Sequence, residues 1–170
     1  YCGRLYAEKR IPFLLEAAQR IRERFPGFQL IVVGDGPERF LVEEAAERNP
    51  WIRYVGPCFG REKALYLSLA DLFMMPGLVG LAILDAFAAG LPLATTNIGY
   101  HSPEIDYLRA GENGLLSEDD LDAYVHDVST LLSSPETLAR MKADAMRSSE
   151  RYSVERMAEL FHQGVLSALA

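Results

Sequence analysis

The feature that most constrains the fold is an alternation of short apolar runs with longer helical stretches along residues 1–116. The run at 28–33 is largely apolar, which is typical of a strand buried on both faces of a parallel sheet. Strands that alternate with helices favour a doubly wound parallel sheet of the α/β class. The six runs that predict strands are 1–3, 28–33, 52–55, 72–75, 93–96 and 114–116.

Helical patterns fill the gaps between these strands. Gly27 ends the first helix, and Gly90 with Pro92 ends the helix after the fourth strand, because glycine often terminates a helix and proline cannot continue one. Ser102 fits the N-cap of a short helix that begins at Pro103. Only helical patterns follow Glu118, so we predict a single domain over 1–170 with a helical tail at about 118–170. The other helices are predicted at about 12–26, 38–48, 62–69, 81–90, 135–148 and 154–169.

Composition and charge narrow the class of protein. The 170 residues are 49% hydrophobic and 24% charged, as expected of one globular domain with a core. The net charge of −7 argues against a protein that binds nucleic acid, or a membrane, through a broadly basic surface. Cys2 and Cys58 have neither disulfide nor metal-ligand spacing, so we expect reduced thiols, no metal site and a cytoplasmic location. The chain opens at Tyr1 within a predicted strand, so we also expect a piece of a longer protein.

The stretch 74–92 combines the end of a strand, a glycine loop and a helix with one acid. Gly77 and Gly80 flank two apolar residues, so bare backbone can approach a ligand there. A loop that feeds a helix N-terminus offers unpaired N–H groups, which suit a phosphate. Asp85 lies just over one turn into that helix, within reach of a polar group beside such an anion. The alternative is a buried helix that carries an incidental acid.

Five short motifs occur in a fixed order along the chain and together resemble one family. They resemble the C-terminal, nucleotide-sugar-binding half of family 4 retaining glycosyltransferases, whose GT-B fold has two facing Rossmann-like domains. The resemblance covers the whole chain, and it extends to a C-terminal helix at 154–169. The motifs are Gly3 and Arg4 with Lys9, Gly34 to Pro37, Asp85 to Pro92, Pro103 to Ile105, and Gly111 with Gly114 to Leu116.

The resemblance implies a role in catalysis and donor binding for two cations in the loop after the first strand. An arginine and a lysine there bind the diphosphate of the donor. Arg4, directly after Gly3, and Lys9, five residues further on, match them. Such cations would neutralise the departing nucleoside diphosphate, which is the main electrostatic demand of sugar transfer without a metal. The family requires no metal and no cofactor besides its nucleotide-diphosphate sugar substrate. Solvated surface cations are the alternative interpretation.

The family signature also contains two acids eight residues apart. Asp85 matches the second acid, which holds ribose hydroxyls, although relatives usually have glutamate there. The first acid should lie at Gly77, so the orientation of the sugar by a carboxylate at this position is not expected. The N–H groups of Leu78, Val79, Gly80 and Leu81 are then expected to bind the phosphates.

The remaining candidate contacts lie in the loop at 55–58, on the helix that follows it, and in the loop after the fifth strand. The segment from Val55 to Cys58 matches the place where the base meets backbone atoms, and Lys63 is expected close to it. His101 could meet the sugar or the acceptor, or could simply be exposed. Glu104 is a further candidate contact, although it could equally orient its own helix.

The leading hypothesis is therefore the donor-binding domain of a retaining glycosyltransferase. It would move a sugar from a UDP- or GDP-type donor to an acceptor such as a glycan or a lipid. Its expected partner is an N-terminal acceptor-binding domain of the same protein, through which the enzyme could contact a membrane surface. The isolated chain is expected to be inactive. The alternatives are a nucleotide-sugar-binding module that has lost catalysis, which the absent acid at Gly77 favours, and a GT-B sugar-nucleotide epimerase.

Overall fold

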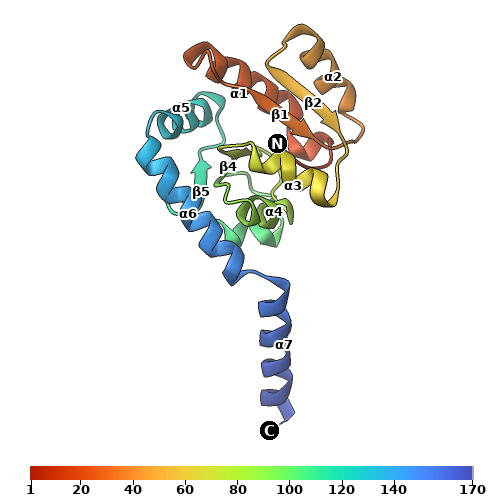
Figure 1. Ribbon diagram of the computed structural model, residues 1–170, viewed down its shortest axis with the longest axis vertical. Coiled ribbons are helices and arrows are strands. Elements are labelled where there is room, and N and C mark those ends of the chain that lie inside the picture. The colour runs from red at the N-terminus through yellow and green to blue at the C-terminus, as the bar shows by residue number, and fades with distance from the viewer. Residues whose placement is uncertain (170) are drawn as a thin grey trace.

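The computed structural model describes residues 1–169 and has the α/β architecture that the strand and helix signals predict (Figure 1). The strands are β1 (Leu30–Val33), β2 (Ile52–Gly56), β3 (Phe73–Met74), β4 (Leu93–Thr96) and β5 (Gly114–Ser117). The α-helices are α1 (Ile11–Arg24), α2 (Arg39–Arg48), α3 (Gly60–Ser68), α4 (Ala82–Ala88), α5 (Leu121–Leu132), α6 (Pro135–Arg151) and α7 (Val154–Leu169). Two short 3-10 helices complete the fold, η1 (Ala7–Lys9) and η2 (Pro103–Tyr107).

All strand pairs are parallel, which confirms the predicted sheet type. The strands form one sheet in the order β1-β2 and a second sheet in the order β3-β4-β5. The expected strand at 1–3 is reduced to an isolated bridge between Cys2 and Val33, supported by hydrogen bonds from Gly3 N–H to Val33 and from Val33 N–H to Tyr1. The structure therefore differs from the expected single sheet of six strands. The reason is local, because residues 1–3 pair with β1 alone within residues 1–169.

The core lies between the strands and the helices that cover them. Helix α1 packs against α2 and α5, whereas α4 packs against α6 (Figure 1). Tyr124 on α5 is fully buried; its ring meets Phe13 of α1 edge-on, with centroids 5.6 Å apart, and its hydroxyl donates to the Ala94 carbonyl of β4 at 3.1 Å. One aromatic residue therefore joins two helices to the sheet.

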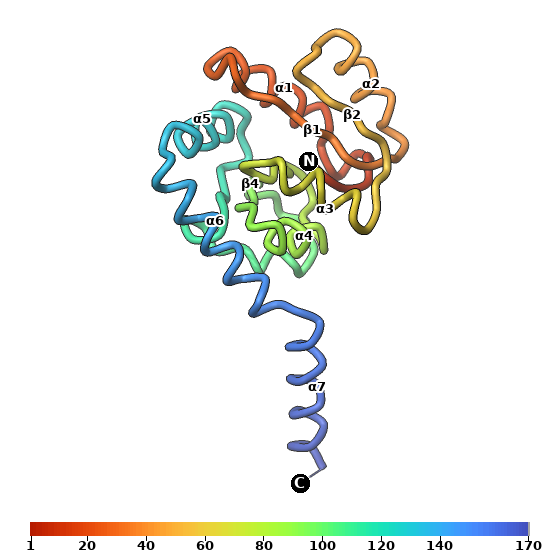
Figure 2. The backbone as a smooth tube through the Cα atoms, in the orientation of Figure 1, coloured from red at the N-terminus to blue at the C-terminus, as the bar shows by residue number. Residues whose placement is uncertain are grey.

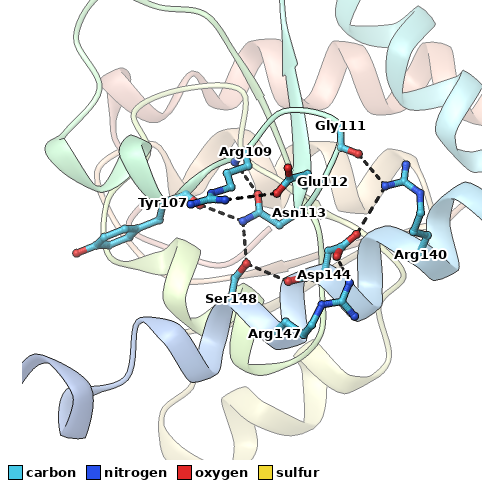
Figure 3. Close-up of polar contacts among 9 residues, drawn as sticks. All are labelled: Tyr107, Arg109, Gly111, Glu112, Asn113, Arg140, Asp144, Arg147 and Ser148. Carbon is cyan, nitrogen blue, oxygen red and sulfur yellow. Dashed lines mark hydrogen bonds and ion pairs between the residues drawn. The ribbon is translucent and has the colours of Figure 1, made fainter.

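The loop before β5 is fastened to α6 by a buried asparagine (Figure 3). Asn113 is 1% exposed, and its Oδ1 accepts from the Arg109 N–H at 2.7 Å. Its Nδ2 donates to the Tyr107 carbonyl at 3.0 Å and to Ser148 Oγ at 2.9 Å. All of the side chain's polar atoms are thus used to hold the 107–113 loop in place.

Helix α7 extends away from the rest of the domain (Figures 1 and 2). It has no buried residue, although it is amphipathic. We call its exposed apolar residues the α7 stripe. The α7 stripe consists of Val154, Met157, Leu160, Phe161, Val165, Leu166 and Leu169. Within residues 1–169, no helix is both long enough and apolar enough to cross a bilayer.

Candidate functional site

A cavity of about 600 Å³ opens at the carboxyl ends of the first three strands. Ligands of doubly wound sheets bind at this edge. Its wall brings together segments that follow β1, β2 and β3 and the loop that follows the Cys2 bridge. The lining residues are Cys2, Gly3, Arg4, Val33, Gly34, Asp35, Gly36, Pro57, Cys58, Phe59, Lys63, Leu81, Ala82 and Asp85.

Six of the predicted donor-binding residues line this cavity, and three of them are charged. Arg4 is exposed and makes no ion pair within the described chain, so its guanidinium is available to an anion. Lys63 Nζ lies 2.7 Å from Asp85 Oδ1, and these two side chains are 29% and 41% exposed. Lys63 on α3 thus orients the carboxylate of Asp85, which lies across the cavity on α4.

The loop between β3 and α4, which we call the central loop, is held by hydrogen bonds to every residue from Pro76 to Val79. Thr96 Oγ1 donates to the Pro76 carbonyl at 2.6 Å, and Thr95 Oγ1 contacts the Gly77 carbonyl at 3.5 Å. The Leu78 N–H donates to the Glu8 carbonyl at 2.8 Å. The backbone of this part of the loop is therefore fixed before it reaches the cavity.

The next two residues differ, because their N–H groups have no hydrogen-bond partner within residues 1–169. These are Gly80 and Leu81, directly before α4. Leu81 lines the cavity and Gly80 does not, so a bound anion could accept a hydrogen bond from the Leu81 N–H. The expectation that Leu78 and Val79 also serve phosphates does not fit the geometry, because their N–H groups are used by Glu8 and His101.

Gly77 occupies a place where no side chain fits. A Cβ built on it would lie 2.4 Å from the Glu8 carbonyl oxygen and 2.4 Å from the Lys9 carbonyl carbon. Both are backbone atoms of η1, which cannot give way as a flexible side chain could. The missing acid therefore coincides with a close approach of two backbone segments, which the sequence alone did not indicate.

Lys9 lies outside the cavity. It is 7% exposed, and its ammonium donates to the Leu78 carbonyl at 2.5 Å. Burial lowers the pKa of Lys9, and the Glu104 carboxylate opposes this effect. In this arrangement Lys9 stabilises the central loop through the Leu78 carbonyl and does not face the cavity. Val55 and Gly77 also lie outside the cavity wall.

His101 contacts backbone rather than open space. Its Nδ1 lies 3.1 Å from the Val79 nitrogen, and its Nε2 lies 2.8 Å from the Thr96 carbonyl oxygen. Burial and the Lys9 ammonium lower the pKa of His101, and the bond to Thr96 opposes them. Glu104 does not line the cavity, and its Oε2 is buried without a hydrogen-bond partner in the described chain.

Several cavity residues were not predicted as site residues from the sequence. Phe59 is 79% exposed at the cavity wall, next to Pro57 and Cys58. Its position directly after the predicted base-binding segment was the available signal. Asp35 and Gly36 belong to one of the five family motifs but were not predicted as site residues. A larger cavity of about 750 Å³ lies at the amino ends of β1 and β3 and contains none of the predicted site residues.

Comparison with known proteins identifies the family. The profile described as "Glycosyl transferases group 1" matches residues 1–134. The chain belongs to the group 1 glycosyltransferase family. Within this family it is 25% identical over 159 residues to alpha-monoglucosyldiacylglycerol synthase of Acholeplasma laidlawii, covering 90% of the chain and 39% of that protein. The chain spans less than half the length of the curated relatives it matches first.

Solved structures of glycosyltransferases share the fold. The pneumococcal O-GlcNAc transferase GtfA, solved with UDP and GlcNAc, superposes with a TM-score of 0.83 at 21% identity, covering 99% of this chain and 35% of that one. The C-terminal domain of a group 1 glycosyltransferase, LpcC from Francisella tularensis, superposes with a TM-score of 0.74 at 19% identity, covering 89% of this chain and 84% of that one. These matches confirm a C-terminal GT-B domain.

Proposed function

We propose that the chain is the donor-binding domain of a retaining glycosyltransferase that takes a sugar from a UDP- or GDP-type donor. One observation carries the proposal. A cavity at the ligand edge of the sheet combines an unpaired cation, Arg4, with the free N–H group of Leu81 and the carboxylate of Asp85. A nucleoside diphosphate needs these three kinds of group together: positive charge and N–H donors for its phosphates, and an acceptor for its ribose hydroxyls.

The proposed roles follow from the chemistry of each group. Arg4 would neutralise the diphosphate as the glycosidic bond to it breaks, which lowers the barrier without a metal. Asp85 would accept hydrogen bonds from the ribose, held in place by Lys63. Gly3 and Cys58 line the same wall and would meet the nucleotide through backbone atoms. Lys9, proposed from the resemblance as a second cation, would have to leave the Leu78 carbonyl to reach a phosphate.

Titration calorimetry of the full chain with UDP and with GDP tests the proposal. Loss of one charge-assisted contact in Arg4→Ala should cost about 1.5–3 kcal/mol, or roughly 10- to 150-fold in affinity. Arg53→Ala is the matched control, because Arg53 is an exposed arginine on β2 away from the cavity. Unchanged affinity in Arg4→Ala, or an equal loss in Arg53→Ala, would contradict the role of Arg4. A chain that binds neither UDP nor GDP would contradict the proposed function itself.

A nucleotide-binding module without catalysis is the second candidate, and Gly77 favours it. The place of the first family acid is filled by the η1 backbone, so no side chain at this position can orient the sugar. A module of this kind should bind free nucleoside diphosphate as tightly as the whole donor. An active donor domain should bind the sugar nucleotide more tightly, because the sugar then adds contacts. The comparison of UDP with UDP-glucose in one titration series separates the two.

The proposed partner is an N-terminal acceptor-binding domain of the same protein. The α7 stripe is an apolar surface that nothing within residues 1–169 covers, and such a surface fits a protein interface. Sugar transfer would then need both domains, so the isolated chain should bind nucleotide without transferring sugar. A chain of residues 1–170 that transfers sugar to an added acceptor would contradict this.

A further inference from the structure

His101 connects the carboxyl end of β4 to the central loop. Its Nε2 lies 2.8 Å from the Thr96 carbonyl oxygen, and its Nδ1 lies 3.1 Å from the Val79 backbone nitrogen. A carbonyl can only accept a hydrogen bond and a backbone N–H can only donate one. Nε2 therefore carries the hydrogen, and Nδ1 is an unprotonated acceptor. The two contacts together define a single neutral tautomer.

Val79 directly precedes the two free N–H groups. Its side chain is fully buried, and its carbonyl accepts from the Ser102 N–H at 3.2 Å. His101 and Ser102 thus hold both backbone polar groups of Val79. The Val79 carbonyl and the Gly80 N–H belong to the same planar peptide unit, so fixing the one sets the direction of the other.

We propose that neutral His101 is a positioning residue for nucleotide binding, because it holds the Val79 backbone that leads to Leu81 at the cavity wall, and that its protonation weakens binding. The proposal rests on the proposed function. A protonated Nδ1 would point a hydrogen at the Val79 N–H, so the contact at 3.1 Å would be lost and the loop would shift. His101 is then neither a sugar nor an acceptor contact.

The surroundings of His101 set the direction of the pH response. The charged groups that act on it are the Lys9 ammonium on η1 and, through Lys9, the Glu104 carboxylate on η2. Burial first, and then Lys9, lower the pKa of His101 below its ordinary value of 6.5, against the opposing bond to Thr96. The neutral form of His101 is therefore the major form at pH 6.5 and above, and the contact is lost as the pH falls through the lowered pKa.

The test compares UDP affinity at several pH values between 8 and 5 for the wild type and three variants. His101→Leu removes both contacts and should weaken binding by roughly 3- to 10-fold at pH 8. His101→Asn keeps an acceptor near the place of Nδ1 and does not titrate, so it should retain most of the affinity. The control is His126→Asn, because His126 is exposed on α5.

The ratio of wild-type to His101→Asn affinity is the readout, because the terminal phosphate of UDP itself titrates and its effect cancels in the ratio. We expect this ratio to fall as the pH drops below 6.5, and the corresponding ratio for His126→Asn to stay constant. A second readout, the nitrogen NMR shifts of His101 at pH 8, should report protonated Nε2 and unprotonated Nδ1.

The possible failures are distinct. Equal pH responses in the wild type and His101→Asn, wild-type affinity in His101→Leu at pH 8, or a protonated Nδ1 at pH 8 each overturn the role of His101 while the proposed function stands. A wild type that binds neither UDP nor GDP at pH 8 overturns the proposed function and this proposal with it.

Discussion

Gly77 illustrates how a single residue can be fixed by packing rather than by chemistry. Its absent side chain allows the η1 backbone to lie against the central loop, where the Leu78 N–H bonds to Glu8. The Gly77→Ala substitution should therefore lower the free energy of unfolding by about 1–3 kcal/mol through overpacking. Urea unfolding measures this loss.

Gly99→Ala is the matched control, because a Cβ built on Gly99 meets nothing within 4 Å. Restoring the family acid with Gly77→Glu should destabilise the fold for the same reason as Gly77→Ala. A Gly77→Glu chain as stable as the wild type would show that η1 can move aside, and that an acid is tolerated there.

Phe59 is a large aromatic side chain that is exposed where a base is expected. Stacking of a base on an aromatic ring is worth about 1–3 kcal/mol, so Phe59→Ala should weaken UDP binding by roughly 5- to 150-fold. The affinity for inorganic pyrophosphate, which has no base, should not change. Phe40→Ala is the control on α2, because Phe40 is also exposed, at 60%. Calorimetry with both ligands decides whether Phe59 contacts the base, and an equal loss for pyrophosphate would argue against stacking.

Asn113 acts at the scale of elements, because it fastens the loop before β5 to α6 (Figure 3). Asn113→Ala removes three hydrogen bonds and leaves the part-buried Arg109 N–H without its acceptor. We expect a loss of about 2–4 kcal/mol in the free energy of unfolding. Asn97→Ala, at an exposed asparagine after β4, should be nearly neutral. Thermal unfolding of both variants checks the contrast, and equal midpoints would contradict it.

The helices show how far local signals reach. The helices predicted at 135–148 and 154–169 match α6, which begins at Pro135, and α7, which spans Val154–Leu169. Gly90, with a φ of 67°, follows α4 as a terminator should. The helix expected after Ser102 is a 3-10 helix of five residues, η2. Local sequence fixes such boundaries because capping and periodicity act within a few residues.

The candidate site was predicted in outline, because parallel strands bring their carboxyl ends to one edge. Arg4 and Asp85 could be placed there from their positions after predicted strands. The burial of Lys9 against the Leu78 carbonyl and the two hydrogen bonds of His101 could not be predicted. Both depend on which carbonyl or N–H group a distant segment brings close. The backbone conformation of Arg10 could not be predicted either, because its φ of 56° is unusual for a residue other than glycine.

At the scale of the whole molecule, α7 contributes no buried residue to the domain. A chain ending at Ser153 should therefore keep the melting temperature and the UDP affinity of the full chain. The exposed α7 stripe should also cause the full chain to associate at high concentration. Sedimentation can measure this association. Phe161→Glu in the full chain should reduce this association without changing the melting temperature. A shorter chain that melts well below the full one would show that α7 supports the domain.

The division of the strands into two sheets has a consequence for how the protein unfolds. The cavity wall takes Gly34 and Gly36 from the β1 side and Leu81 and Asp85 from the β3 side. A molecule bound there is a bridge between two potential foldons, because opening of either side releases it. A ligand concentration of a hundred times the dissociation constant adds about 2.7 kcal/mol to the free energy of opening of both foldons. Amide hydrogens on both sheets should thus slow their exchange together, so that the ligand turns two neighbouring units into one cooperative whole.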